Sequence, residues 1–235
     1  MTSSSSARTT PPGFDTHAAV TRSLLGWGVV AGPVYLVVGL ALGLTRPEFD
    51  LTRHSLSLLM LGEHGWMQRA NLLLSAAMVL AAAYGMLRTI RNGRGLAMAT
   101  LIFVYAAGMI LSAAFPPDPV EGFPADSAGR SVSTSGVLHM LFGAVGFVAL
   151  AGAAFVYARW CHSRGESHRS VFAAGCGTVI LLGFLGGAML ALSAVGVALL
   201  WLGVLSGWVW LAVAAGHLYI VVPHPVLSQR TGGAT

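Results

Sequence analysis

Long apolar stretches separated by short polar segments make up most of the chain. A helix of about 20 apolar residues spans the hydrocarbon core of a bilayer. The first stretch, 23–45, exceeds the apolar core of a signal peptide and predicts an uncleaved membrane helix. Further spans are predicted at 70–87, 95–115, 136–158, 170–193 and 201–222. The pattern predicts an all-α polytopic bundle of six transmembrane helices.

The polar ends of the chain predict a simple domain organisation. Residues 1–22 are rich in Ser, Thr and Pro, which predicts a disordered cytoplasmic tail. Residues 23–222 then form one transmembrane domain, and 223–235 form a second cytoplasmic tail. The segment 170–229 contains no Asp, Glu, Lys or Arg, so its division into two helices rests on length alone.

Charge supports the membrane assignment and suggests an orientation. Apolar residues make up 55% of the chain and charged residues 9%, against about 25% charged residues in soluble domains. In membrane proteins, Arg concentrates in cytoplasmic loops. A cytoplasmic N-terminus places nine of the 13 Arg residues on the cytoplasmic side. With six helices, this orientation predicts that both termini are cytoplasmic. The four outside are Arg46, Arg53, Arg69 and Arg130. Six of the eight acidic residues also lie outside: Glu48, Asp50, Glu63, Asp118, Glu121 and Asp126.

The sequence excludes several kinds of partner. It contains no nucleic-acid-binding motif and no Gly-rich phosphate loop, so we expect neither a nucleic-acid partner nor a cofactor. Membrane lipids are the expected surroundings. Cys161 and Cys176 lack metal-ligand spacing, and neither a disulfide nor a zinc site is expected from them. Glycine pairs at four-residue spacing, such as Gly183/Gly187, predict close packing of helices within the chain.

Polar residues that could take part in catalysis or binding gather at the predicted outer face. They lie in the segments 46–69 and 116–135 and at the adjoining helix ends. Ionisable residues at membrane depth usually face a bundle interior or a wet cavity, and apolar residues flank His139 on both sides. Because sequential antiparallel helices place their outer ends side by side, eight residues could line one cavity: Asp50, His54, Ser55, Ser57, Gln68, Asn71, Asp118 and His139.

These residue types suggest catalysis on a lipid or isoprenoid-like substrate. His139 and Asp118 would form an acid–base pair, and Ser55 would be the nucleophile. The substrate would be positioned by polar neighbours, namely His54, Asp50, Gln68 and Asn71. An alternative is a metal site built from His54, His64, His139 and Asp118, with an open position for water.

Each candidate also has a structural interpretation. His139 could pin helix ends together through a hydrogen bond, and Asp118, which precedes a proline, could start a turn. Ser55 and Ser57 could cap a short helix. His217, nearer the inner end, could bond a backbone carbonyl. The alternative function is therefore a non-catalytic protein that binds a lipid or small molecule or serves as an accessory subunit.

Several short segments of the loops and helix ends resemble the DUF998 family of bacterial and archaeal membrane proteins. The segments are HSLSLL at 54–59, GWMQRAN at 65–71, GMLR at 85–88, FPPDP at 115–119, GFP at 122–124, GVLH at 136–139 and FVYAR at 155–159. The resemblance extends from the first apolar stretch to the last and implies a six-helix membrane fold. The family has no assigned activity, so the resemblance implies no reaction.

Overall fold

The computed structural model describes residues 14–120, 122–125, 127, 132–191 and 193–226. Six long helices and one short 3₁₀ helix follow one another along the chain. They are α1 (Thr16–Thr45), η1 (Leu56–Met60), α2 (Gly65–Thr89), α3 (Gly93–Ala114), α4 (Thr134–His162), α5 (Ser167–Met189) and α6 (Ala194–Val221). All six long helices are long and apolar enough to cross a membrane. The predicted all-α bundle of six transmembrane helices is confirmed.

Two helices begin seven residues earlier than predicted, because polar residues cap them. Asp15 accepts a hydrogen bond from the backbone N–H of Ala18, so α1 begins at Thr16 and includes residues 16–22, which were expected to be disordered. Ser193 accepts one from Gly196, so α6 begins at Ala194 rather than at 201. The predictions for 1–13, 227–235, Glu121, Asp126 and Arg130 fall outside the described residues.

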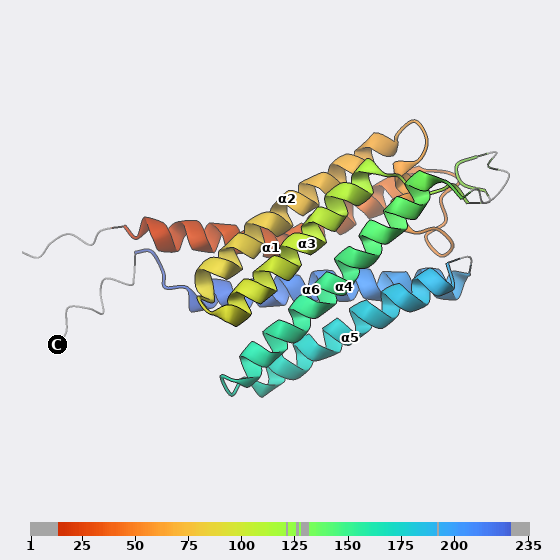
Figure 1. Cartoon of the computed structure of the whole chain (residues 1–235). Coiled ribbons are helices and arrows are strands. Elements are labelled where there is room, and N and C mark those ends of the chain that lie inside the picture. The colour runs from red at the N-terminus through yellow and green to blue at the C-terminus, as the bar shows by residue number, and fades with distance from the viewer. Residues whose placement is uncertain (1–13, 121, 126, 128–131, 192, 227–235) are drawn as a thin grey trace, which may run out of the picture.

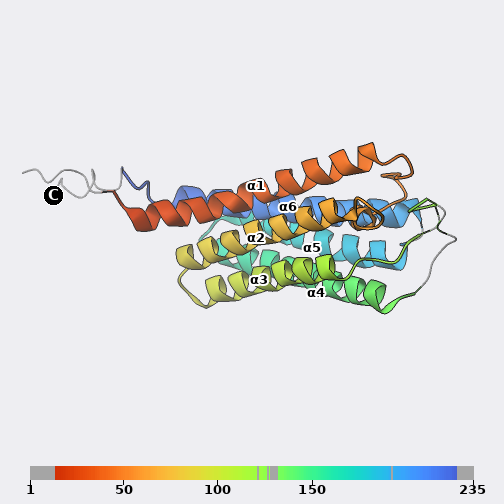
Figure 2. The same cartoon turned by 90° about the horizontal axis from the view of Figure 1, so that it is seen from above.

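The helices form a closed ring. Each helix packs against the next one along the chain, and α6 packs against α1 (Figures 1 and 2). One contact that holds the ring closed is Arg22 of α1. Its guanidinium donates to the carbonyls of Tyr219 and Val222 at 3.0 and 2.7 Å and lies 3.9 Å from the Tyr219 ring centre.

The two ends of the bundle differ in character. One end holds the start of α1 and the end of α6, and we call it the terminal end (Figure 1). The other, the loop end, holds η1 and the link between α3 and α4. The segment 46–64 folds over the loop end, where Leu56, Leu58, Leu59 and Met60 are buried against the helices. The loop end is therefore covered by packed chain.

Glycines let α5 and α6 touch backbone to backbone. A Cβ atom on Gly183 would lie 2.7 Å from the carbonyl oxygen of Leu199 and 2.8 Å from the nitrogen of Gly203. On α1, a Cβ on Gly32 would lie 2.8 Å from that of Trp208. These contacts confirm the prediction that the glycine pairs serve packing within the chain.

Replacing Gly183 with alanine is expected to destabilise the protein by about 1–3 kcal/mol, because the added methyl group forces α5 and α6 apart. Gly175→Ala is the matched control on the same helix, since a Cβ there meets nothing within 4 Å. Unfolding of the two purified variants in detergent measures the difference. Equal stabilities of the two variants would show that α5 and α6 can move apart without loss of unfolding free energy.

Candidate functional site

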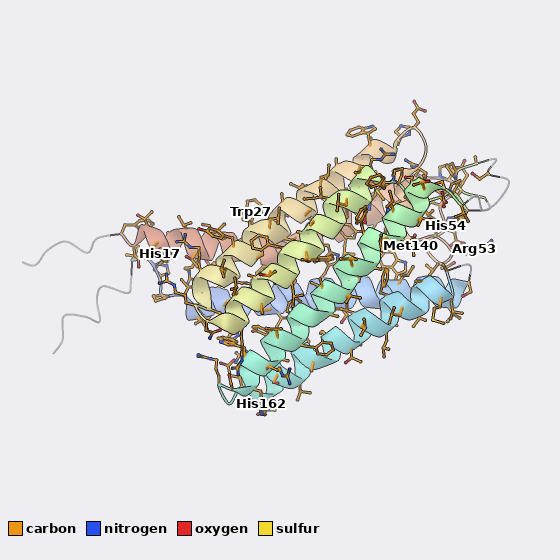
Figure 3. All side chains as sticks on the ribbon, viewed as in Figure 1. His17, Trp27, Arg53, His54, Met140 and His162 are labelled. Atoms are coloured by element: carbon orange, nitrogen blue, oxygen red, sulfur yellow. The ribbon has the colours of Figure 1, made fainter. Side chains whose placement is uncertain are left out.

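A cavity of about 440 Å³ lies inside the ring of helices. It extends from the loop-end residues Arg53 and His54 to Trp208, near the middle of α6. Figure 3 shows Arg53, His54 and Met140, all of which line it, together at the loop end, and His17 and His162 at the opposite end. The cavity therefore joins the covered loop end to the membrane-spanning part of the bundle.

Aromatic side chains form the deep part of the cavity. The ring of Trp208 lies 5.2 Å from that of Tyr35 and 6.3 Å from that of Tyr105, measured between ring centres. Phe147 and Phe184 stack with their centres 4.8 Å apart. All five residues line the cavity. This region offers an apolar surface of the kind that suits a hydrocarbon chain.

Polar side chains form the loop-end part of the cavity. Of the eight residues expected to line one cavity, six do so: His54, Ser55, Ser57, Gln68, Asp118 and His139. Asp50 and Asn71 do not. One continuous space thus combines polar groups, most of them from the loop-end segments, with aromatic rings further along the helices, and Gln68 lies near Tyr35 where the two meet.

His54 is held by the segment that covers the loop end. Its ring packs at 5.4 Å from both Phe49 and Phe123, and only 6% of the residue is exposed. Burial lowers the pKa of His54, and the charge of Asp50 opposes this only in part. Its Nδ1 accepts a hydrogen bond of 3.0 Å from the backbone N–H of Asp50. The neutral ring therefore carries its proton on Nε2, which is a donor.

The His139 ring carries its proton on the other nitrogen from that of His54. It lies near the start of α4, and its Nδ1 lies 3.1 Å from the carbonyl oxygen of Ser112 and 3.0 Å from that of Phe115. Both carbonyls belong to the end of α3, where backbone acceptors lack helical partners. Because both partners are acceptors, Nδ1 carries the proton and Nε2 of the neutral ring is an acceptor. The interpretation that His139 pins helix ends together is confirmed.

Asp118 is engaged with the start of α4. Its carboxylate accepts hydrogen bonds from the backbone N–H of Ser133, at 3.1–3.2 Å, and from the Ser133 hydroxyl. The Ser133 hydroxyl in turn accepts the N–H of Gly136 at 3.0 Å. A Cβ on Gly136 would overlap the Asp118 carboxylate. Asp118 therefore anchors the α3–α4 link to the first turn of α4.

The predicted Ser–His–Asp arrangement is not assembled. No hydrogen bond joins His139 to Asp118 among the described residues, because each is engaged with backbone or with a capping serine. Ser55 pairs with Ser57 through their hydroxyl oxygens at 3.0 Å. Ser55 precedes the 3₁₀ helix η1 without a side-chain capping bond. The catalytic roles of these three residues stay predictions.

Asp50 and Asn71 do not line the cavity and form hydrogen bonds outside it. Asp50 accepts from the backbone N–H and the hydroxyl of Thr52 at 2.8 and 2.7 Å, and these bonds lower the pKa of Asp50. Asn71 donates to the carbonyl of Tyr35 at 3.1 Å and to Gln68 Oε1 at 3.2 Å. Asn71 therefore joins α2 to α1 and orients Gln68, which does line the cavity.

The alternative metal site at the loop end is not formed either. Within the described ranges, donor atoms of three His, Cys, Asp or Glu residues converge at one place, which consists of Cys161, Glu166 and His217. That place is at the terminal end. The predicted set of His54, His64, His139 and Asp118 fails because its members are held by separate backbone contacts or lie apart.

The cavity-lining residues of α6 were not predicted from the sequence. They include Val197, Trp201, Val204 and Trp208, which recur at helical spacing on one face. Trp201 also donates its Nε1–H to the carbonyl of Leu51 at 3.2 Å, which ties α6 to the loop-end cover. The spacing is a signal in principle. In a helix that is apolar all round, however, it does not distinguish the cavity face from the lipid face.

Comparison with known proteins identifies the family. The family model described as "Protein of unknown function (DUF998)" matches residues 29–217. The match reaches from α1 to α6 and includes every segment that lines the cavity. Comparisons with curated proteins and with solved structures gave no match. The resemblance seen in the loops is thereby confirmed, and this multi-pass membrane protein belongs to the DUF998 family.

Proposed function

We propose that the protein binds one amphiphilic molecule, a lipid or isoprenoid-like compound with a single chain, in the loop-end cavity. The observation that carries the proposal is that one cavity combines polar groups from the loop-end segments with aromatic rings further along the helices. Small-molecule sites typically occupy about 300–1,000 Å³ and combine apolar walls with a few polar groups. An amphiphile satisfies both parts at once, with its head at His54 and His139 and its chain toward Trp208.

The polar groups favour a phosphate or hydroxyl head. Arg53 supplies a positive charge, and His54 Nε2–H supplies a donor. His139 Nε2 supplies an acceptor, as its Nδ1 is committed to the end of α3. A phosphate monoester or an alcohol can accept from His54 and donate to His139. A purely hydrocarbon ligand would leave these polar groups without partners, which is costly in a buried site.

We further propose that the loop end faces the outside of the cell membrane. The proposal rests on the excess of Arg in cytoplasmic segments. Among the described residues, the terminal end carries Arg22, Arg88, Arg91, Arg94, Arg159, Arg164 and Arg169. The loop end carries Arg46, Arg53 and Arg69. The ligand would then enter from the outer leaflet.

A second candidate is catalysis on the same amphiphile. The observation in its favour is the His139 Nε2 acceptor beside the cavity, since such an atom can remove a proton from a bound hydroxyl or water. In this version Asp118 takes no part in proton transfer, because Ser133 holds its carboxylate. His139 would be the base, and Ser55 or water would be the attacking group.

Photochemical labelling tests the binding proposal. The probe is a single-chain alkyl phosphate with a diazirine in its chain, added to the protein in phosphatidylcholine vesicles. We expect mass spectrometry to find labels on Phe147, Val204 or Trp208, and excess unlabelled alkyl phosphate to remove them. Labels confined to the exposed Val171, Val179 and Ile220, without competition, would refute a ligand in the cavity.

The head group is tested by a variant and a second probe. Arg53→Gln is expected to weaken binding of the alkyl phosphate by roughly tenfold, the loss expected for one charged hydrogen bond. Binding of the corresponding alkyl alcohol is expected to stay unchanged. Conversion of either probe to a product that disappears in His139→Ala would support catalysis, and unchanged probes would support binding alone.

A further inference from the structure

A second group of chemically active side chains lies at the terminal end, opposite the cavity. Cys161 belongs to the last turn of α4, Glu166 to the link before α5, and His217 to α6. One ligand atom from each, the thiol sulfur, a carboxylate oxygen and an imidazole nitrogen, lies within 4.8 Å of the others. We propose that these three side chains bind a transition-metal dication, with zinc as the expected ion.

The ligand types fit zinc. Thiolate, imidazole and carboxylate are its usual protein ligands, and the sulfur disfavours magnesium and calcium, which prefer oxygen. A tetrahedral zinc ion places its ligand atoms about 3.3–3.6 Å apart. His217 Nε2 and Glu166 Oε2 are already 3.4 Å apart. The sulfur of Cys161, which is fully buried, lies within 4.8 Å of both atoms.

The imidazole of His217 is oriented for coordination. Its Nδ1 lies 2.6 Å from the hydroxyl of Tyr157, which is itself buried, rather than near the backbone carbonyl expected from the sequence. Metal-bound histidines almost always engage their second ring nitrogen in such a bond. With the Nδ1 proton donated to Tyr157, Nε2 presents its lone pair to Glu166 and Cys161.

The carboxylate is oriented by the chain around it. The backbone N–H of Glu166 donates to the carbonyl of Cys161 at 3.0 Å, which turns the link back over the end of α4. Arg164 and Arg169 donate to the two carboxylate oxygens at 3.0 and 3.2 Å. These bonds hold the Glu166 carboxylate in place beside His217.

Binding of the ion is coupled to loss of one proton. The Cys161 thiol releases its proton to water, and the thiolate and carboxylate both coordinate the ion. Arg164 and Arg169 keep their hydrogen bonds to Glu166. Three protein ligands leave a fourth position for water, and the ion would connect α4, the α4–α5 link and α6.

Cobalt provides a direct test. Purified protein in detergent, stripped with a chelator, is titrated with Co²⁺, which reports a thiolate ligand by a charge-transfer band in the near ultraviolet. We expect this band at one equivalent, and we expect one equivalent of Zn²⁺ to displace it. Absence of the band in the wild-type protein would overturn the proposal without any variant.

Three variants locate the ion. Cys161→Ser is expected to remove the charge-transfer band, and Cys176→Ser, which alters the other free cysteine on α5, is expected to retain it. Tyr157→Phe removes the partner of His217 Nδ1 and is expected to weaken Co²⁺ binding about 10–100-fold while the band remains at saturation. Loss of the band in Cys176→Ser, or full Co²⁺ affinity in Tyr157→Phe, would contradict the assigned ligands.

Discussion

Replacing Gly143 with leucine is expected to lower the affinity for the alkyl phosphate about a hundredfold while the fold is retained. Gly143 lines the cavity from α4, and the nearest atom to a Cβ there is Phe184 Cε2 at 3.9 Å. The leucine side chain therefore projects into open space and displaces about three to four methylene groups of the ligand. At about 0.8 kcal/mol for each buried methylene, the loss approaches 3 kcal/mol.

Gly175→Leu is the control for added bulk. It adds the same side chain to α5 at a position where a Cβ meets nothing within 4 Å, and the cavity lining does not include it. Affinity for the probe is measured in detergent by competition against photochemical labelling. If Gly143→Leu binds the alkyl phosphate as tightly as Gly175→Leu does, the chain of the ligand is not in this cavity.

Asp118→Ala is expected to destabilise the protein by about 2–3 kcal/mol, measured by unfolding in detergent. The substitution leaves two donors of Ser133 without their acceptor and removes a negative charge from the start of α4. Asp118→Asn retains an acceptor oxygen and is expected to recover part of the loss. Asp50→Ala is the control, because its exposed carboxylate bonds, among the residues that the structure describes, only Thr52 in a turn.

The same variant separates a structural Asp118 from a catalytic one. A residue that serves proton transfer can usually be removed with little loss of stability, because active sites are not built for stability. Wild-type stability in Asp118→Ala, combined with loss of any turnover, would therefore restore Asp118 to the acid–base role. A loss of stability without change in probe binding would show that Asp118 serves only to stabilise the start of α4.

The helices were predictable from the sequence because the bilayer imposes one strong requirement, a long apolar run for each crossing. Their first residues were misplaced because apolarity says little about where a helix begins. Asp15 and Ser193 determine those starts through single capping bonds. Both are short polar residues just before the helical segment, so attention to capping would have placed the two boundaries correctly.

The cavity was predictable in part. Polar residues such as His139 stand out in an apolar stretch, so the polar part of the cavity could be recognised. Their hydrogen-bond partners could not, because sequence does not say whether the Asp118 carboxylate faces a cavity or a helix start. Tyr35, Tyr105 and Trp208 were hidden among lipid-facing apolar residues. Cys161, Glu166 and His217 come from three elements and show no ligand spacing.

The contact between α1 and α6 has a consequence for how the protein is made. Helices α1 and α6 lie far apart in the sequence and must meet before the ring is complete, and Arg22 reaches its carbonyl partners only when α6 is present. Until then Tyr35 and the polar groups near His139 lack the wall of the cavity that α6 supplies. A truncation within α6 is therefore expected to expose an incomplete interior to lipid and to quality-control proteases.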